Sequence, residues 1–557
     1  MKRIKHLASA LAVLLLPVIS ADAQNAQLDG LLLTASQFTP VDMMKYSQNN
    51  YSFTTGRVAA MGGAFTALGG DMASAGINPA GLGMYRTSVW SFSPAMTFTQ
   101  NHEAYSTMTE NHASRFGFNN IGTVLRLSQS SSGLTGFNLG LSYNKAEDFN
   151  YRGSVRLPAA AGGSLLNVFQ LQLNGLYDFL DTGTWRGLSE KDLNNAPFNN
   201  GNIYIDEWGA VLGYQSGIFP GLGGDNMYGL NSLPEGSNNT PSLRYESRGS
   251  VSEYNIAGGF NINNLLYLGF DFGFRDIYQK MSFYYTEAYE GNYSGTAQLY
   301  LQQMNYNQYL LMQGSAFNFK IGAIFRPVPQ LRIGLAYHSP SYSSVRKKYY
   351  GSMGTAYYGN PQSKHYTSEI AGYDYSFNTP SRLLAGVALT LGDYLALSFD
   401  YERVWYNKMR YTSESYEIQE SFRTAIAHDY RAADNFRAGI EVKPLPGFAL
   451  RAGYAYYGSP VKEKDSEGND LIFKNIFTTS SSHISAGVGI WLGRATTLDI
   501  AYVYSRYEIA PYGLYYYNGP ARLPQGMVNE VTYKPVDDIN GGALHRHTIT
   551  ATLNFLF

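Results

Sequence analysis

The sequence predicts an all-β fold, a transmembrane antiparallel β-barrel of about 14 strands with an N-terminal hatch segment inside the lumen. Three observations lead to this fold class. Segments of alternating hydrophobicity recur along the chain, short and long connections between them alternate strictly, and the last strand ends in phenylalanine. Each is taken in turn below.

Segments with a period of two recur from residue 87 onward. In one of them Leu395, Leu397 and Phe399 alternate with small, polar or charged residues such as Asp400. Such alternation indicates a strand with one apolar face. A soluble barrel would turn that face inward and a membrane barrel would turn it outward, so alternation alone leaves both open.

The lengths of the connections favour the membrane barrel. Strands are expected at 87–100, 117–130, 134–152, 240–262, 265–283, 313–327, 330–342, 374–391, 394–408, 433–443, 447–457, 481–492, 496–507 and 545–557. Short turns are expected at 132–133, 263–264, 328–329, 392–393, 444–446 and 493–495, and every other connection is long. This alternation is typical of bacterial outer-membrane barrels, with short turns in the periplasm and long loops outside. An even number of strands then places both ends of the barrel chain on the periplasmic side.

The N-terminus has the pattern of a secretory signal. Positive residues precede an apolar run at 7–19, and Ala21-Asp22-Ala23 is a small-residue cleavage site. We therefore expect a signal peptide at 1–23, a hatch or plug at 24–86 and the barrel at 87–557. The chain has no cysteine and a net charge of -1, without basic runs, so nucleic acid is not an expected partner.

The C-terminal strand places Ile549, Ala551, Leu553, Phe555 and Phe557 on one face. A terminal strand that ends in phenylalanine resembles the signal read by the outer-membrane assembly machinery, which is an expected partner. The expected location is the outer membrane of a Gram-negative type envelope, in contact with its lipid and lipopolysaccharide. The 47 tyrosines suit the aromatic girdles of such a barrel.

The longest loop runs from about 153 to 241 and is expected to be extracellular. Leu166, Phe169, Leu173, Leu176 and Leu180 follow helical spacing, and a second helical set surrounds Trp208, Val211 and Leu212. Two interpretations remain open: the helices pack together as a lid, or their apolar faces form a ligand groove.

The segment before the first strand is rich in small residues and turn formers. It contains Arg57, then Met61-Gly62-Gly63-Ala64-Phe65-Thr66-Ala67-Leu68, then Ile77 and Asn78-Pro79-Ala80-Gly81-Leu82. Together with the strand-seven stretch 331–340, these residues resemble the FadL-type family of long-chain fatty-acid transporters of the outer membrane. The family usually has a bulky aromatic residue before Asn-Pro-Ala, where this chain has Gly76-Ile77.

The resemblance implies an uptake channel for hydrophobic small molecules, with long-chain fatty acids as the expected ligands. A ligand would pass beside the hatch and leave sideways through a kink in strand three. Ligand or hatch roles are implied for a set of motif residues: Arg57, Met61, Phe65, Leu68, Ile77, Asn78, Pro79 and Ala80. In strand three, Gly136, Gly140 and Phe149 are the candidates for the gate, although these glycines could equally be wall positions against which a large side chain packs.

Five charged residues on strands nine to eleven should face the lumen: Asp400, Glu402, Arg437, Glu441 and Arg451. On the lipid face an arginine near the midplane would cost about 2–4 kcal/mol. The set forms either an ion-pair lattice that braces wall and hatch, or a binding site in which Arg437 or Arg451 receives a ligand carboxylate. Arg57 has the same two interpretations.

Nothing in the sequence indicates an enzyme, a cofactor or a metal site. No catalytic or phosphate-loop motif occurs, and the nine histidines lack metal-ligand spacing. Two alternatives to the uptake channel remain: a haem or porphyrin receptor, and a structural or adhesive barrel that displays the 153–241 loop.

Overall fold

The computed structural model describes most of the barrel and much of the segment before it. The described residues are 27–29, 32, 35–48, 53–103, 111–130, 133–157, 164–176, 186–222, 227–230, 233, 235–292, 300–358, 360–462, 480–509, 514, 516–518 and 542–557. The expected signal peptide at 1–23 lies outside them.

The wall is a closed barrel of 14 antiparallel strands, which confirms the expected fold class. Three wall strands are each made of two segments. In chain order the wall consists of β2 (Val89–Glu103), β3 (His112–Gln129), β4 (Leu134–Asp148) with β5 (Tyr151–Arg156), β6 (Glu235–Ile262), β7 (Leu266–Asn292), β8 (Tyr300–Val328), β9 (Leu331–His338) with β10 (Tyr342–Tyr358), β12 (Ala371–Asn378) with β13 (Arg382–Leu391), β14 (Leu395–Trp405), β16 (Ala432–Leu445), β17 (Phe448–Tyr457), β18 (Ser481–Trp491), β19 (Thr496–Ile509) and β21 (Gly542–Leu556). β21 pairs with β2 and closes the ring.

Short strands complete the sheet at its margin. β11 (Asn360–Thr367) pairs with β10, and β15 (Arg410–Thr412) pairs with β12. A separate two-stranded sheet joins β1 (Gln27–Asp29) to β20 (Tyr516–Asn518).

The outer face of the barrel is apolar and the inner face is polar. On β14, Leu397 and Phe399 are 39% and 52% exposed, whereas Asp400 and Glu402 are 0% and 4% exposed. A soluble barrel would show the reverse. The two orientations that the alternation left open are thereby decided in favour of a membrane barrel.

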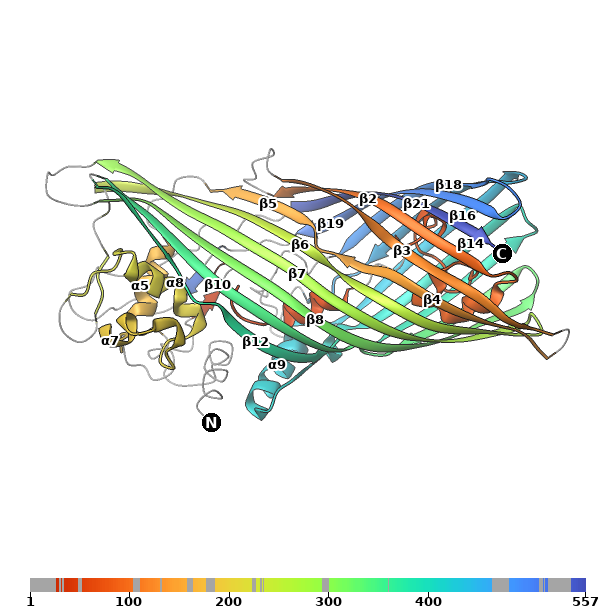
Figure 1. Ribbon diagram of the computed structural model, residues 1–557, viewed down its shortest axis with the longest axis horizontal. Helices are drawn as coiled ribbons and strands as arrows, with labels where there is room; N and C mark the ends of the chain where they lie inside the picture. Colours follow the sequence, from red (N-terminus) through yellow and green to blue (C-terminus); the bar gives the residue numbers. More distant parts are fainter. Residues whose placement is uncertain are drawn as a thin grey trace.

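The short turns have the backbone that tight hairpins require. Asn263 and Asn264 join β6 to β7 and both have positive φ, 55° and 57°. This is the type I′ geometry that matches strand twist and that asparagine tolerates. The short turns gather at one end of the barrel, on the right in Figure 1, which we call the turn end.

At the opposite end, the loop end, β6, β7 and β8 extend beyond the strands expected at 240–262, 265–283 and 313–327, β8 most of all. They contain 28, 27 and 29 residues, or about 90 Å at 3.3 Å per residue, whereas a tilted strand crosses a bilayer with about 10. Their outer halves form a wall beyond the apolar belt. The helices of the 153–241 segment lie against this wall (Figure 1).

Those helices are α5 (Leu165–Leu173), α7 (Glu190–Asn194) and α8 (Trp208–Gln215), with the short η3 (Pro197–Asn199) and η4 (Ile205–Glu207). Ser164 precedes α5, and its hydroxyl accepts a hydrogen bond from the Leu166 amide and caps the helix. It ends earlier than its apolar spacing suggested; Leu176 is buried beyond it, and Leu180 lies outside the described residues. α5 and α8 pack together, with the Phe169 ring against Gly209.

The segment before the first strand lies against the inner faces of the wall. It contains α2 (Pro40–Ser47), α3 (Gly56–Ala60), α4 (Ser74–Ile77) and η2 (Pro79–Met84). α2 starts with a capping arrangement between Thr39 and Asp42 and has Pro40 at its first position. Two further elements, η5 (Tyr406–Lys408) and α9 (Tyr416–Asp429), follow β14. Among the helices described, none is long and apolar enough to cross a membrane.

Candidate functional site

Within the expected hatch at 24–86, the part from residue 53 to 86 packs directly on wall glycines. A side chain at Gly322 would collide with Asn78, and one at Gly453 would collide with the Gly62 backbone. The hatch backbone therefore touches the wall at positions where only glycine leaves room. Other wall glycines meet the hatch in the same way: Gly259, Gly269, Gly334, Gly439 and Gly487.

Asn78 fixes the Asn-Pro-Ala motif to the wall. Its side-chain amide donates to the Thr66 carbonyl at 2.7 Å and to the Ala323 carbonyl at 3.2 Å. Its side-chain oxygen accepts from the Ala80 amide at 3.2 Å. Asn78 is fully buried, so these bonds replace water that it has lost.

Two ion-pair chains connect the hatch to wall strands between β13 and β19. In the first, Arg382 and Arg437 both bind Glu402, at 3.1 and 2.9 Å. Arg437 also approaches Asp400 at 3.8 Å, and Asp400 accepts from the Thr66 amide of the hatch at 2.8 Å.

In the second chain, Arg57 of α3 donates to both carboxylate oxygens of Glu441, at 2.9 and 3.0 Å. Arg451 binds Glu441 at 2.6 Å and Asp499 at 2.7 Å. All five lumen charges singled out from the sequence take part in one of these two chains. Arg57 joins the hatch to them.

A third buried cluster was missed in the sequence. On β6 to β8, Arg275 binds Glu253 at 2.7 Å, and Lys320 binds Asp271 at 2.7 Å as well as Glu253. Charged residues at alternate positions of an otherwise apolar strand, such as Asp271 and Arg275, were the available signal.

Strand three is interrupted between Asp148 and Tyr151. At the break the Phe149 amide donates to the Gly249 carbonyl of β6 at 3.0 Å. Gly249 has φ 141°, and a side chain there would collide with the Tyr278 carbonyl, so the opposite strand needs glycine. The chain resumes as β5, which pairs with β6.

The break lies beside a seam in the wall. Register pairs between β3 and β4 end at Asn120 and Asn144. From there toward the loop end, within the described residues, β3 pairs with β2 while β4 and β5 pair with β6. Side chains bridge the seam: Arg115 donates to Asn150 at 2.8 Å, and Ser154 donates to Asn111 at 2.9 Å.

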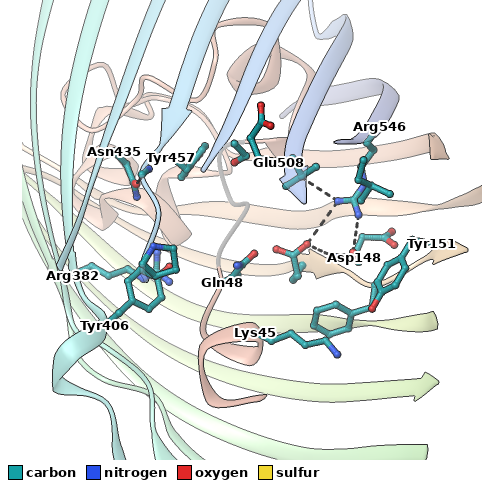
Figure 2. Close-up of a pocket in the computed structure, with 17 residues that line it drawn as sticks. Lys45, Gln48, Asp148, Tyr151, Arg382, Tyr406, Asn435, Tyr457, Glu508 and Arg546 are labelled. Atoms are coloured by element: carbon teal, nitrogen blue, oxygen red, sulfur yellow. Dashed lines mark hydrogen bonds and ion pairs between the residues drawn. The ribbon is translucent and has the colours of Figure 1, made fainter. Parts of the chain in front are cut away.

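A cavity of about 80 Å³ lies inside the barrel at the break (Figure 2). Its lining combines aromatic side chains with both positively and negatively charged side chains: Lys45, Glu147, Phe149, Tyr151, Arg382, Tyr406, Tyr457, Tyr507, Glu508 and Arg546. Arg546 donates to the Asp148 carbonyl at 3.0 Å and approaches Glu147 at 3.7 Å.

The helix α2 borders this cavity through Lys45 (Figure 2). The Tyr46 ring meets the Phe149 ring edge-on at 5.7 Å, and the Lys45 ammonium lies 5.5 Å from the same ring. Burial lowers the pKa of Lys45 to about 8, since an ammonium without water is disfavoured, although Asp42 opposes the shift. Arg382 donates to the Ser47 carbonyl at the end of α2.

The residues predicted from the sequence are divided between regions. Phe149 lines the cavity, whereas Gly136 and Gly140 lie in β4 towards the turn end; Gly136 follows a register shift, and Gly140 faces Leu82 of the hatch. Met61, Phe65, Leu68, Ile77, Asn78, Pro79 and Ala80 are buried in the hatch. Arg57 and Leu68 line a second cavity at the turn end. The seam and the role of α2 were missed, because both depend on contacts between distant segments.

Comparison with known protein families assigns the chain to one of them. The profile of the outer membrane protein transport protein family (OMPP1/FadL/TodX) matches residues 228–510, half of the chain. The chain belongs to this family. No curated protein sequence matches it.

Solved structures with similar folds include a FadL homologue from Pseudomonas aeruginosa, with 11% identity, TM-score 0.46, and coverage of 91% of this chain and 98% of the other. The toluene transporter TbuX of Ralstonia pickettii has 14% identity, TM-score 0.44 and coverage of 90% and 98%. The toluene transporter TodX of P. putida has 10% identity, TM-score 0.44 and coverage of 90% and 97%.

Membership of the OMPP1/FadL/TodX family confirms the resemblance seen in the motifs and the outer-membrane location. It is a family of transport proteins, which agrees at the family level with the expectation that the chain is not an enzyme. Among the described residues, no group of three or more His, Asp or Glu side chains could hold a metal ion.

Proposed function

We propose that the protein takes up hydrophobic small molecules, with long-chain fatty acids as the ligand class, and releases them sideways through strand three. The ligand would enter from the loop end, pass the apolar core cluster to which residues of α2 and of the 153–241 helices both belong, and reach the cavity at Phe149. It would then cross the seam between β3 and β5 into the outer membrane.

The seam is the observation that carries this proposal. An acyl chain that left into water would lose about 0.8 kcal/mol per CH₂, whereas a lateral exit keeps it in an apolar environment. Between the paired wall strands that the structure describes, a lateral exit would have to break a ladder of backbone hydrogen bonds. At the seam, the described bridges include side-chain hydrogen bonds from Arg115 and Ser154.

The lining of the cavity favours an amphipathic ligand. Rings of Phe149, Tyr406 and Tyr457 offer apolar contact, while Lys45 and Arg546 place positive charge nearby. A fatty acid could direct its alkyl chain toward the rings and its carboxylate toward these cations.

Cross-linking the seam tests the proposal. The chain has no cysteine, so an Arg115→Cys/Asn150→Cys pair can be joined selectively by a short bifunctional thiol reagent. The matched control is Arg346→Cys/Asp374→Cys, because these exposed residues also bind each other, at 2.6 Å, but across paired strands. Uptake of labelled oleate would be measured in cells that lack the native gene, at equal amounts of folded barrel.

We expect the seam cross-link to abolish most oleate uptake and the control cross-link to leave it unchanged. Uptake that survives the seam cross-link would contradict lateral release. If the uncross-linked protein fails to restore oleate uptake, the fatty-acid assignment is wrong, and labelled toluene and haem would be tested next. Failure with every apolar solute would favour the display of the 153–241 segment as an adhesive surface.

A further inference from the structure

A second cavity, of about 470 Å³, lies at the turn end and shares no lining residue with the cavity at Phe149. It is bounded by the hatch at Leu68, Gly69 and Gly70 and by the turns that follow β8 and β13. By the orientation of bacterial barrels, the turn end faces the periplasm.

The charge of this cavity is unbalanced. Four cationic side chains line it against two carboxylates, Asp393 and Glu441, and the cations are Arg57, Arg326, Arg332 and Lys443. Glu441 is already occupied, because Arg57 and Arg451 bind it at 2.9 and 2.6 Å and Lys443 approaches at 3.7 Å.

Arg326 and Arg332 differ from the guanidiniums of the ion-pair chains. Arg326 donates to the Pro329 carbonyl, at 3.2 Å from Nε and 3.0 Å from Nη2. Arg332 donates to the Leu68 carbonyl of the hatch and lies near the Met84 sulfur. Within the described part of the chain neither takes part in an ion pair, and the buried Nε of Arg332 has no hydrogen-bond partner.

We propose that this cavity binds a small oxyanion, a carboxylate or phosphate group, between Arg326 and Arg332. A guanidinium presents a planar fork of donors that matches such oxyanions, and the orphaned Nε of Arg332 supplies a donor that the protein itself leaves unused. The cavity has room for the anion with several waters.

The anion would link the wall to the hatch. Arg332 already donates a hydrogen bond to the Leu68 carbonyl. A bound anion that immobilises this guanidinium would therefore also immobilise the adjoining hatch residues Gly69 and Gly70. Periplasmic anions would thereby stabilise the hatch in its place. The inference does not depend on which compound is transported.

Titration calorimetry on the purified, detergent-solubilised full protein tests the site. Inorganic phosphate and butyrate are titrated separately, because the two arms distinguish a phosphate source from a carboxylate source. The variants are Arg332→Gln, Arg326→Gln/Arg332→Gln and Arg332→Lys, and the matched control is Arg494→Gln in the exposed turn before β19.

We expect saturable binding of at least one anion to the wild type and to Arg494→Gln. Arg332→Gln should weaken it about ten- to hundredfold, as expected for the loss of one or two charge-assisted hydrogen bonds, and Arg332→Lys should weaken it less. Hydrogen exchange of the peptide that contains 64–72 should slow on binding in the wild type but not in the double variant.

Two outcomes would overturn the proposal. One is the absence of saturable binding of either anion to the wild type. The other is undiminished binding by the double variant. Arg332→Lys keeps the positive charge but lacks the planar guanidinium. Its comparison with Arg332→Gln therefore separates a folding defect caused by loss of the charge from the loss of the guanidinium donors.

Discussion

A methyl group at Gly322 should push the hatch away from the wall. In the structure, the added Cβ of Gly322→Ala would collide with the Asn78 side-chain oxygen and lie 3.3 Å from Pro79 Cδ. Asn78 is fully buried and cannot move without weakening its bonds to the Thr66 and Ala323 carbonyls. Overpacking costs about 1–3 kcal/mol, and each weakened hydrogen bond about 1 kcal/mol more. With both bonds weakened, we expect a total destabilisation of about 3–5 kcal/mol.

The matched control is Gly136→Ala, also in a wall strand. There the nearest atoms to an added Cβ are 3.7 Å away, an ordinary contact. This change should be neutral or stabilising by about 0.4–1 kcal/mol, through the unfolded state.

Denaturant unfolding in micelles, followed by tryptophan fluorescence, measures the difference, and conductance in planar bilayers reports on the hatch. Gly322→Ala should unfold at lower denaturant and show more frequent open events. Equal unfolding midpoints and equal conductance of the two variants would refute the idea that the hatch rests on this glycine.

Two further changes test the electrostatic contacts of the segment inside the barrel. Arg57→Gln should destabilise the folded protein by about 3–5 kcal/mol, because it leaves a buried charge network incomplete. The control Arg403→Gln should cost about 0–1 kcal/mol, because both partners of its ion pair are 42% exposed. Equal midpoints of the two variants in denaturant unfolding would contradict this prediction. The second change is Lys45→Met. Burial lowers the pKa of Lys45 to about 8. Below pH 8 the buried side chain is charged and the full cost in folding stability is present; as the pH rises toward 10.5 the folded protein releases this proton and the cost disappears. Unfolding at pH 7 and pH 10 should therefore show the wild type gaining stability relative to Lys45→Met, and a pH-independent difference would count against the buried ammonium.

Local chemistry made the wall predictable from the sequence. Apolar residues at every second position define a strand face wherever it occurs, and Asn263-Asn264 specifies a tight turn without reference to the rest of the chain. The outer ends of β7 and β8, beyond the expected 265–283 and 313–327, were missed for a related reason. Beyond the apolar belt the outward positions are residues such as Tyr284, Asn305 and Asn307, so the membrane pattern ends before the strands do.

The candidate site depends on contacts that no local pattern records. Of the gate candidates Gly136, Gly140 and Phe149, the break in strand three lies at Phe149, where Gly249 on the neighbouring strand permits it. From the sequence alone, Gly322 is a glycine that weakens its strand. The structure shows that the hatch, which is distant in the sequence, packs against it and leaves no room for a side chain. The sequence showed which residues were unusual, and the structure was needed to pair them.

The relative strength of these contacts indicates where a ligand could pass. The cavity at Phe149 measures about 80 Å³, smaller than a cavity of about 150 Å³ that admits benzene, so something must move. Displacing the hatch would break the Arg57 ion pair and the Asn78 bonds together. Opening the seam at the Arg115 and Ser154 bridges costs about 1 kcal/mol per hydrogen bond. We therefore infer that the seam opens before the hatch leaves, and the seam cross-link and the Gly322→Ala variant should affect uptake independently of each other.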